Sequence, residues 1–237
     1  MHSSKSQILV ALKRQGRCSV DELAIALHLA PMTVRQHLAT LERDGLVVSV
    51  EERQRMGRPH FVFSLTEQGD ESFGMRYDRI ALQLLLEVGR LDSQEIAGLS
   101  AEEKTALLFD RLADRFISRY RPRMGPLTLP QRIAAVSDAL HTESGFTEWA
   151  ATPEGYEIRD YNCFFDRLNG TTANHCRWHE RILTELLETP VECRSDAPPS
   201  VQLCHFVIKS PNTRAGARPM AAVLSMAGAH REPSATG

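Results

Sequence analysis

The sequence predicts an α+β protein with an N-terminal unit, a central helical region and a small C-terminal unit. Apolar residues recur at helical spacing through the first 45 residues, and two β-rich segments follow directly. Beyond residue 126, helical and strand-like segments alternate in pairs. Of the 237 residues, 42% are hydrophobic and 24% are charged, which is ordinary for a soluble globular protein.

Three short helices are predicted first. Apolar residues at helical spacing and a terminal glycine predict a helix over residues 4–16. Ser19 and Glu22 form a capping-box pattern that opens a second helix, and Pro31 suits the first position of a third, which the Asp-Gly pair at 44–45 ends. The buried stripe of the third helix is expected at Val34, Leu38 and Leu41.

A β-hairpin is predicted next, because residues 46–50 and 60–65 are β-rich and a charged loop joins them. Three helices with a tight turn before the third, followed by a hairpin, are typical of a winged helix-turn-helix. Residues 1–65 contain nine Lys and Arg against six Asp and Glu, whereas the rest of the chain contains 19 against 24. A basic first third on an acidic remainder suits one DNA-binding module attached to a domain with another task.

The central region is predicted to be helical. A short helix capped by Thr66 is followed by residues 77–88, whose apolar side chains cover more than one face. Such a helix needs burial on two sides, and either a dimer seam or the centre of a monomer provides it. A capping box at Ser100 opens a further helix that runs to about Tyr120, and the Pro- and Gly-containing segment 121–126 breaks it.

The C-terminal part is predicted to contain a helix, two strands, two helices and two further extended segments. We expect a domain organisation of 1–70, 71–125 and 126–209, with a disordered tail over 210–237 that is rich in Pro, Gly, Ala and Ser. The predicted elements of the third part are the helix 129–144, the strands 145–150 and 155–162, the helices 163–170 and 174–188, and the extended segments 190–195 and 201–209.

Two sets of residues are candidates for DNA contact. In a helix-turn-helix the second helix of the pair lies in the major groove, and the wing reaches the neighbouring backbone or minor groove. Arg and Gln side chains suit guanine and adenine edges. The candidates that lie off the buried stripe of the third helix are Thr33, Arg35, Gln36, His37 and Thr40, and those in the wing are Arg53, Arg55 and Arg58.

Four cysteines lie within 42 residues of the C-terminal part, with the spacing Cys163-x12-Cys176-x16-Cys193-x10-Cys204. Iron-sulfur clusters are normally held by four thiolates, and soft thiolates favour iron-sulfur, zinc or copper over hard cations. The alternative interpretation is that these cysteines are small buried hydrophobes.

Other residues near this set, and a fifth cysteine, have less clear roles. His179 follows Cys176 at Cys-x2-His spacing and is the replacement ligand if Cys193 is remote. His175 and His205 are direct neighbours of cysteines, and surface or hydrogen-bonding roles are favoured for them. Cys18 lies between the first two predicted helices, where a packing role is favoured.

These motifs carry a resemblance to known regulators. The segments 30–48 and 57–69 resemble the winged helix of ArsR-like and DeoR-like bacterial regulators. The cysteine pattern, with Asn162-Cys-Phe-Phe and a Cys at the start of the last strand, resembles the SufR-type repressors of iron-sulfur-cluster biogenesis, and the combined resemblance spans most of residues 4–208. It implies a cluster, [4Fe-4S] or [2Fe-2S], held by Cys163, Cys176 and Cys204, with Cys193 as the less secure fourth ligand.

The expected function is therefore that of a homodimeric, repressor-like transcription factor that binds an inverted-repeat operator on double-stranded DNA under the control of an iron-sulfur cluster in the C-terminal sensor domain. The open alternatives are zinc or a thiol redox switch at the same cysteines, an organic effector bound near the aromatic residues of the first C-terminal hairpin, and a protein-interaction adaptor. An enzyme is not expected, because the sequence has no phosphate loop, nucleophile elbow or zinc-protease motif. Without a signal peptide or a long apolar run, a cytoplasmic location with no membrane partner is expected.

Overall fold

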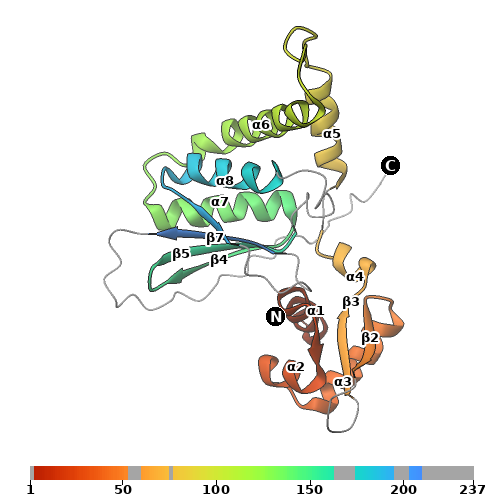
Figure 1. The fold of residues 1–237 in the computed structure, drawn as a ribbon. Coiled ribbons are helices and arrows are strands. Elements are labelled where there is room, and N and C mark those ends of the chain that lie inside the picture. The colour runs from red at the N-terminus through yellow and green to blue at the C-terminus, as the bar shows by residue number, and fades with distance from the viewer. Residues whose placement is uncertain (1–2, 53–59, 75–76, 163–173, 195–202, 210–237) are drawn as a thin grey trace, which may run out of the picture.

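The protein was analysed as a computed structural model that describes residues 3–52, 60–74, 77–162, 174–194 and 203–209. The first unit is a winged helix. Its elements are α1 (Ser4–Gln15), β1 (Cys18–Ser19), α2 (Val20–Leu27), α3 (Pro31–Arg43), β2 (Val47–Glu52), β3 (His60–Leu65) and α4 (Glu67–Glu71). The strands form an antiparallel sheet in the order β1-β3-β2 (Figure 1). The three predicted helices and the hairpin are confirmed.

Local sequence explains the boundaries of these helices. The Ser19 hydroxyl accepts a hydrogen bond from the Glu22 amide and the Glu22 carboxylate accepts one from the Ser19 amide, so the predicted capping box is present. Pro31 starts α3, and His28 adopts a left-handed conformation with φ 53° that turns the chain between α2 and α3. The expected stripe of α3 is buried against α1 and α2.

One detail differs from the prediction. Cys18 was expected in a loop, but it lies in the two-residue strand β1, opposite Phe63 of β3. Its side chain is buried in the core of the winged helix, as a packing role requires. Burial is the main reason that the pKa of the Cys18 thiol rises to about 11, and the nearby Glu22 carboxylate adds to the rise.

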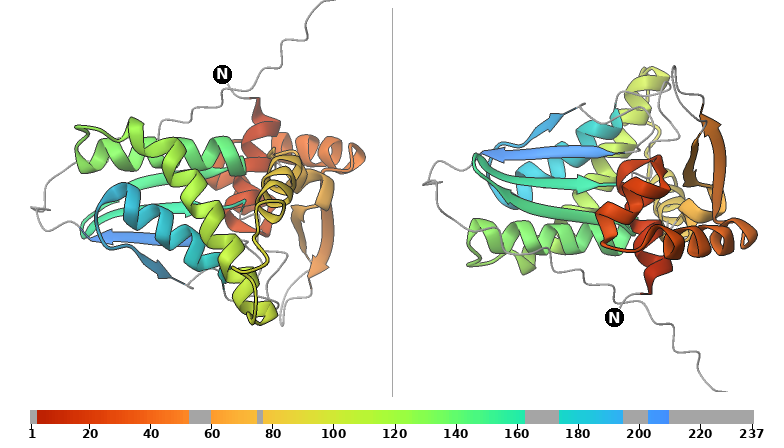
Figure 2. Two further views of the ribbon diagram at one scale, coloured as in Figure 1. Left: turned by 90° about the horizontal axis from the view of Figure 1, so that it is seen from above. Right: turned by 90° about the horizontal axis from the view of Figure 1, so that it is seen from below.

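The second unit is a four-stranded antiparallel sheet with helices on one face (Figures 1 and 2). The strand order is β4-β5-β7-β6. Its elements are α5 (Tyr77–Val88), α6 (Ala101–Tyr120), the 3-10 turn η1 (Arg121–Arg123), α7 (Leu129–Ser144), β4 (Thr147–Thr152), β5 (Gly155–Asp160), α8 (Asn174–Leu187), β6 (Glu192–Arg194) and β7 (Cys204–Lys209). The last two predicted extended segments contain β6 and β7, which are antiparallel neighbours.

The core of the second unit includes α6 as well as the elements beyond residue 126. Phe109, Phe116 and Tyr120 of α6 share one buried cluster with residues of α7, α8, β5 and β7, such as Ile182 and Phe206. The expected boundary near residue 125 therefore falls between two helices, α6 and α7, that contribute to the same core. The expected helix over 163–170 and the expected tail over 210–237 lie outside the described residues. No helix among the described residues is long and apolar enough to cross a membrane.

Candidate nucleic-acid interface and cysteine site

The candidate base-reading residues lie on the free side of α3. Arg35 and Gln36 are exposed, and Thr33, His37 and Thr40 are half-buried at the rim of the same helix. The Thr40 hydroxyl donates a hydrogen bond to the Gln36 carbonyl oxygen over 2.9 Å, so it is already engaged within the helix. Arg35 and Gln36 are therefore the candidates best placed to reach base edges.

The wing is described up to its two ends. Glu52 of β2 pairs with His60 of β3 in the last step of the described register. The predicted wing contacts Arg53, Arg55 and Arg58 lie outside the described residues. Arg17, which precedes β1, forms an ion pair with Glu52 over 3.6 Å.

The second candidate site is centred on Asp160, the last residue of β5. Its carboxylate is completely buried. One oxygen, Oδ1, accepts hydrogen bonds from the Thr147 hydroxyl over 3.3 Å and from the Asn162 amide over 3.1 Å. The Ser144 hydroxyl lies 3.1 Å from the same oxygen and 2.8 Å from the Leu140 carbonyl oxygen, so its one proton has two acceptors within reach. The other, Oδ2, lies 3.2 Å from Nε2 of the buried His179 on α8. A buried carboxylate requires this number of partners, and here they come from α7, β4, α8 and the end of β5.

Three of the four predicted cysteines adjoin partners of this carboxylate. Cys204 is the cross-strand partner of Asp160 in the register of β5 and β7. Cys163 directly follows Asn162, and Cys176 lies one helical turn before His179 in α8. Cys163 itself and the side chain of Cys176 lie outside the described residues. Among the described residues, Asn162, His179 and Cys204 meet at Asp160, and each of them is one of the four cysteines or lies within three residues of one.

Cys193 occupies a different place. It lies on the edge strand β6 opposite Phe206, which is two residues beyond Cys204 on β7. Both Cys193 and Cys204 are half-buried and pack against the core beneath the helices. Among the described residues, no three His, Cys, Asp or Glu side chains form a group that could hold a metal ion.

The candidate histidines are on opposite sides of the sheet. His179 belongs to the Asp160 network, and its ring packs at 5.4 Å from Phe206. His205 follows Cys204 and therefore points to the other face of β7, where its Nε2 lies 3.1 Å from a Glu157 carboxylate oxygen. His175 has a position in α8, but its side chain is outside the description. A hydrogen-bonding role for His205 agrees with this placement.

The Asp160 network was not identified from the sequence. The available signal was the segment Asp160-Tyr-Asn-Cys163, in which a carboxylate ends a strand immediately before a cysteine. Ser144 and Thr147 carry no sequence signal, because only the turn at Gly145 brings their hydroxyls to the carboxylate.

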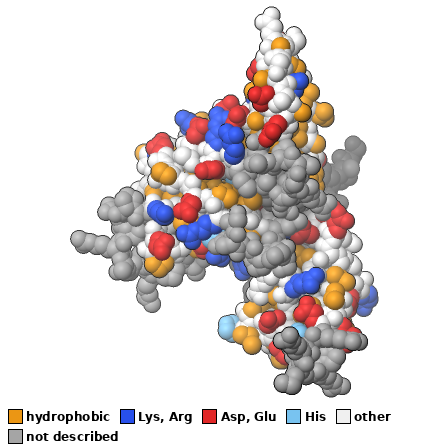
Figure 3. Space-filling view, viewed as in Figure 1, with side chains coloured by type: hydrophobic (Ala, Val, Ile, Leu, Met, Phe, Trp, Pro, Cys, Tyr) orange, Lys and Arg blue, Asp and Glu red, His pale blue; other side chains and the backbone are white. Residues whose placement is uncertain are grey.

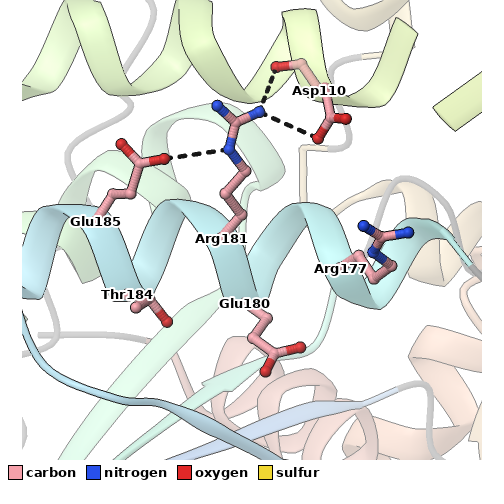
Figure 4. A pocket seen from close by; sticks show the side chains of 6 residues that line it. All are labelled: Asp110, Arg177, Glu180, Arg181, Thr184 and Glu185. Carbon is pink, nitrogen blue, oxygen red and sulfur yellow. Dashed lines mark hydrogen bonds and ion pairs between the residues drawn. The ribbon is translucent and has the colours of Figure 1, made fainter. Parts of the chain in front are cut away.

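A hollow of about 310 Å³ between α6 and α8 is a charged surface feature (Figure 4). The Arg181 guanidinium lies in it and forms ion pairs with Asp110, Asp114 and Glu185. Its lining residues are Asp110, Arg177, Glu180, Arg181, Thr184 and Glu185. These interactions hold α8 against α6, and every residue that lines the hollow is polar or charged, whereas a typical site for an organic ligand is lined mainly by hydrophobic and aromatic residues. The aromatic residues expected near such a ligand pack instead, with Phe146 buried and Trp149 in contact with Tyr156.

Comparison with known proteins finds a family model for the first unit. Residues 1–48 match the family model described as winged helix-turn-helix DNA-binding. No curated protein matches the chain. The first unit is thus a winged helix-turn-helix DNA-binding domain, and the second unit is a separately packed α+β body attached to it.

Several solved structures are similar to part of the chain. A transcriptional regulator homologue from Pyrococcus horikoshii OT3 is 25% identical, with coverage of 37% of this chain and 82% of that one and a TM-score of 0.26. The transcriptional regulator PA4135 is 25% identical, with coverage of 48% and 76% and a TM-score of 0.27. Bacillus subtilis PadR in complex with operator DNA is 17% identical, with coverage of 59% and 90% and a TM-score of 0.27. These likenesses cover only part of the present structure.

Proposed function

We propose that the chain is a repressor-like transcription regulator whose binding to an inverted-repeat operator is controlled by an iron-sulfur cluster in the second unit. The observation that carries this proposal is that Asn162, His179 and Cys204 meet at Asp160, because these residues are next to Cys163, three residues after Cys176, and a cysteine itself. These three residues are also the best matches to the SufR-type pattern. A site in this position ties β5, β7 and α8 together.

The residue types of the proposed ligand set suit an iron-sulfur cluster. Thiolates are the usual ligands of such clusters, and the proposed set supplies three from three different segments. Bound there, the cluster supplies a redox- and oxygen-sensitive group. The protein's own part is to hold the ligand segments in place, which the Asp160 hydrogen bonds do at the end of β5 and at α8.

The fourth ligand is assigned to Cys193 or His179. Metal-binding histidines are commonly oriented by a carboxylate at the second ring nitrogen, and Asp160 contacts His179 in that manner. Cys193 is two strands from β5 and lies opposite Phe206 rather than Cys204. This placement favours His179 over Cys193.

The homodimer is proposed to form through α5. One face of this helix packs on the core of the second unit through Ile80 and Leu84. On the same side, buried Glu87 pairs with Arg115 of α6 over 2.7 Å. The opposite face is apolar and exposed, and Figure 3 shows hydrophobic side chains gathered along this projecting helix. The exposed residues are Leu82, Leu85, Leu86 and Val88. A two-fold related copy would cover them, since a two-fold interface uses the same patch twice.

Anaerobic purification of the full chain tests the cofactor. We expect a brown protein with visible absorbance and bound iron and sulfide, and we expect Cys163→Ser, Cys176→Ser and Cys204→Ser to lose them while Cys18→Ser keeps them. A colourless protein that retains stoichiometric zinc after incubation with iron and sulfide would support the zinc alternative. A protein that binds neither but forms a reversible disulfide would support the redox switch.

A further inference from the structure

The two units meet at a small apolar joint. Phe146 and Tyr161 of the second unit are buried there, with ring centroids 5.2 Å apart. Phe73, which follows α4, packs on Phe146 at 5.2 Å. Val10 of α1 and Leu203 before β7 complete this cluster. Arg14 of α1 also forms an ion pair with Glu148 of β4 at its margin.

The backbone approach at the joint is close. The Asn162 side-chain amide donates a hydrogen bond to the Phe73 carbonyl oxygen over 3.4 Å. Gly145 has φ 99°, and a Cβ atom at this position would lie 2.3 Å from the same carbonyl oxygen. Only glycine therefore allows Phe73 to approach the end of α7.

The joint borders the cysteine site. The Asn162 backbone amide donates a hydrogen bond to Asp160, and its side-chain amide donates one to the Phe73 carbonyl oxygen. The next residue in the sequence is Cys163. Leu203, a member of the joint, directly precedes Cys204. A change in the path of either segment at its cysteine would therefore reach the joint within one residue.

On its other side, the joint is connected to the recognition helix through α4. Thr66, which caps α4, donates a hydrogen bond over 2.6 Å to the carbonyl oxygen of Gly45, just after α3. Gly69 of α4 lies so close to the Leu46 backbone that a Cβ atom would be 2.0 Å from its carbonyl oxygen. Buried Lys13 of α1 binds Asp70 of α4 over 2.6 Å. These contacts attach α4 to α1 and to the end of α3.

We propose that this joint, with Phe73 as its central side chain, transmits the state of the cysteine site to the winged helix. The inference rests on the proposed function, since it names the route by which that site controls DNA binding. In this proposal, loss of the cluster releases the chain at Asn162 and Leu203. The packing surface around Phe73 then changes, and because Phe73 follows α4, the position of α4 relative to the second unit changes together with that of α3. Phe73 acts by positioning the DNA-binding domain and contacts neither DNA nor the cysteines.

A double-mutant cycle tests the route. The full chain, Phe73→Ala, Cys163→Ser and the double variant are titrated at one salt concentration with a duplex that the unmodified protein selects from a random pool, and iron and sulfide are measured in each. Coupling between sites typically changes affinity about 5- to 150-fold. We expect Cys163→Ser to lower DNA affinity by a factor of that size in the otherwise unmodified protein, and by less than about 2-fold in the Phe73→Ala background. Ile96→Ala, a half-buried apolar truncation between α5 and α6, serves as the matched control and should leave the full effect.

The outcomes separate the two proposals. If Phe73→Ala binds as much iron as the unmodified protein and Cys163→Ser still has its full effect on DNA affinity in that background, the route is overturned and the proposed function is left intact. If Cys163→Ser has no effect even alone, the proposed function fails, and the route fails with it. Amide hydrogen exchange tests whether the joint exists at all. We expect faster exchange in both α4 and β4 of Phe73→Ala than in the unmodified protein. Unchanged exchange in both elements would show that Phe73 does not join the two units.

Discussion

Replacement of Asp160 by asparagine should destabilise the second unit by about 2 to 4 kcal/mol. The carboxylate is fully buried and accepts hydrogen bonds from the Thr147 hydroxyl and the Asn162 amide, while its second oxygen contacts Nε2 of His179. A neutral amide accepts at only one of the two oxygen positions, so at least one buried polar group loses its acceptor. An unsatisfied buried group costs about 1 to 3 kcal/mol, and a hydrogen bond to a charged group contributes about 1.5 to 3 kcal/mol.

Urea unfolding followed by tryptophan fluorescence measures this cost. Both tryptophans, Trp149 and Trp178, lie in the second unit, and the Trp178 ring is 4.7 Å from His179, so the signal reports on this unit. With a denaturant slope of about 2 kcal/mol/M, the midpoint should fall by about 1 to 2 M. Asp110→Asn, at an exposed ion pair with Arg181, is the matched control and should cost less than about 1 kcal/mol. Equal midpoints for both variants would refute the role given to Asp160.

Four further predictions address the other parts of the molecule. Arg35→Ala should cost about 1 to 3 kcal/mol in DNA binding and relax the preference at one base position, as measured by competition between related duplexes. Arg58→Ala should weaken binding to specific and random duplexes alike, and a loss confined to the specific duplex would contradict a backbone role. Leu85→Glu should shift the protein from dimer to monomer in sedimentation, and an unchanged dimer would exclude the exposed face of α5 as the seam. The pKa of the Cys18 thiol is raised from 9.0 to about 11, so folded stability should fall as pH rises between these values; native protein alkylated at Cys18 as fast as unfolded protein at pH 9 would contradict its burial.

Local sequence signals were sufficient for the first unit. The capping box at Ser19, the proline at 31 and the β-rich composition of 60–65 are each local signals, and the structure places the corresponding boundaries within about two residues of the prediction. The short strand β1 was missed because its existence depends on Phe63, 45 residues away, and not on any local preference of Cys18.

In the second unit, the long-range arrangement of the elements could not be predicted from local sequence. Its helices and strands were predicted, but the strand order β4-β5-β7-β6 depends on pairing between segments far apart in the sequence. The role of Asp160 follows from that pairing, since its register with Cys204 and its contact with His179 are both long-range. Phe73 likewise has no signal in the sequence, because its importance comes from the other unit that packs against it.

The central claim is that the occupied cysteine site changes DNA affinity. Titration of one operator duplex with cluster-loaded protein, cluster-free protein and Cys163→Ser at fixed salt tests it most directly, because salt alone alters such affinities strongly. We predict that the loaded protein binds about 5- to 150-fold more tightly than the other two, which should resemble each other. Equal binding by all three would contradict control by the cluster, even for a protein that remains a DNA-binding dimer.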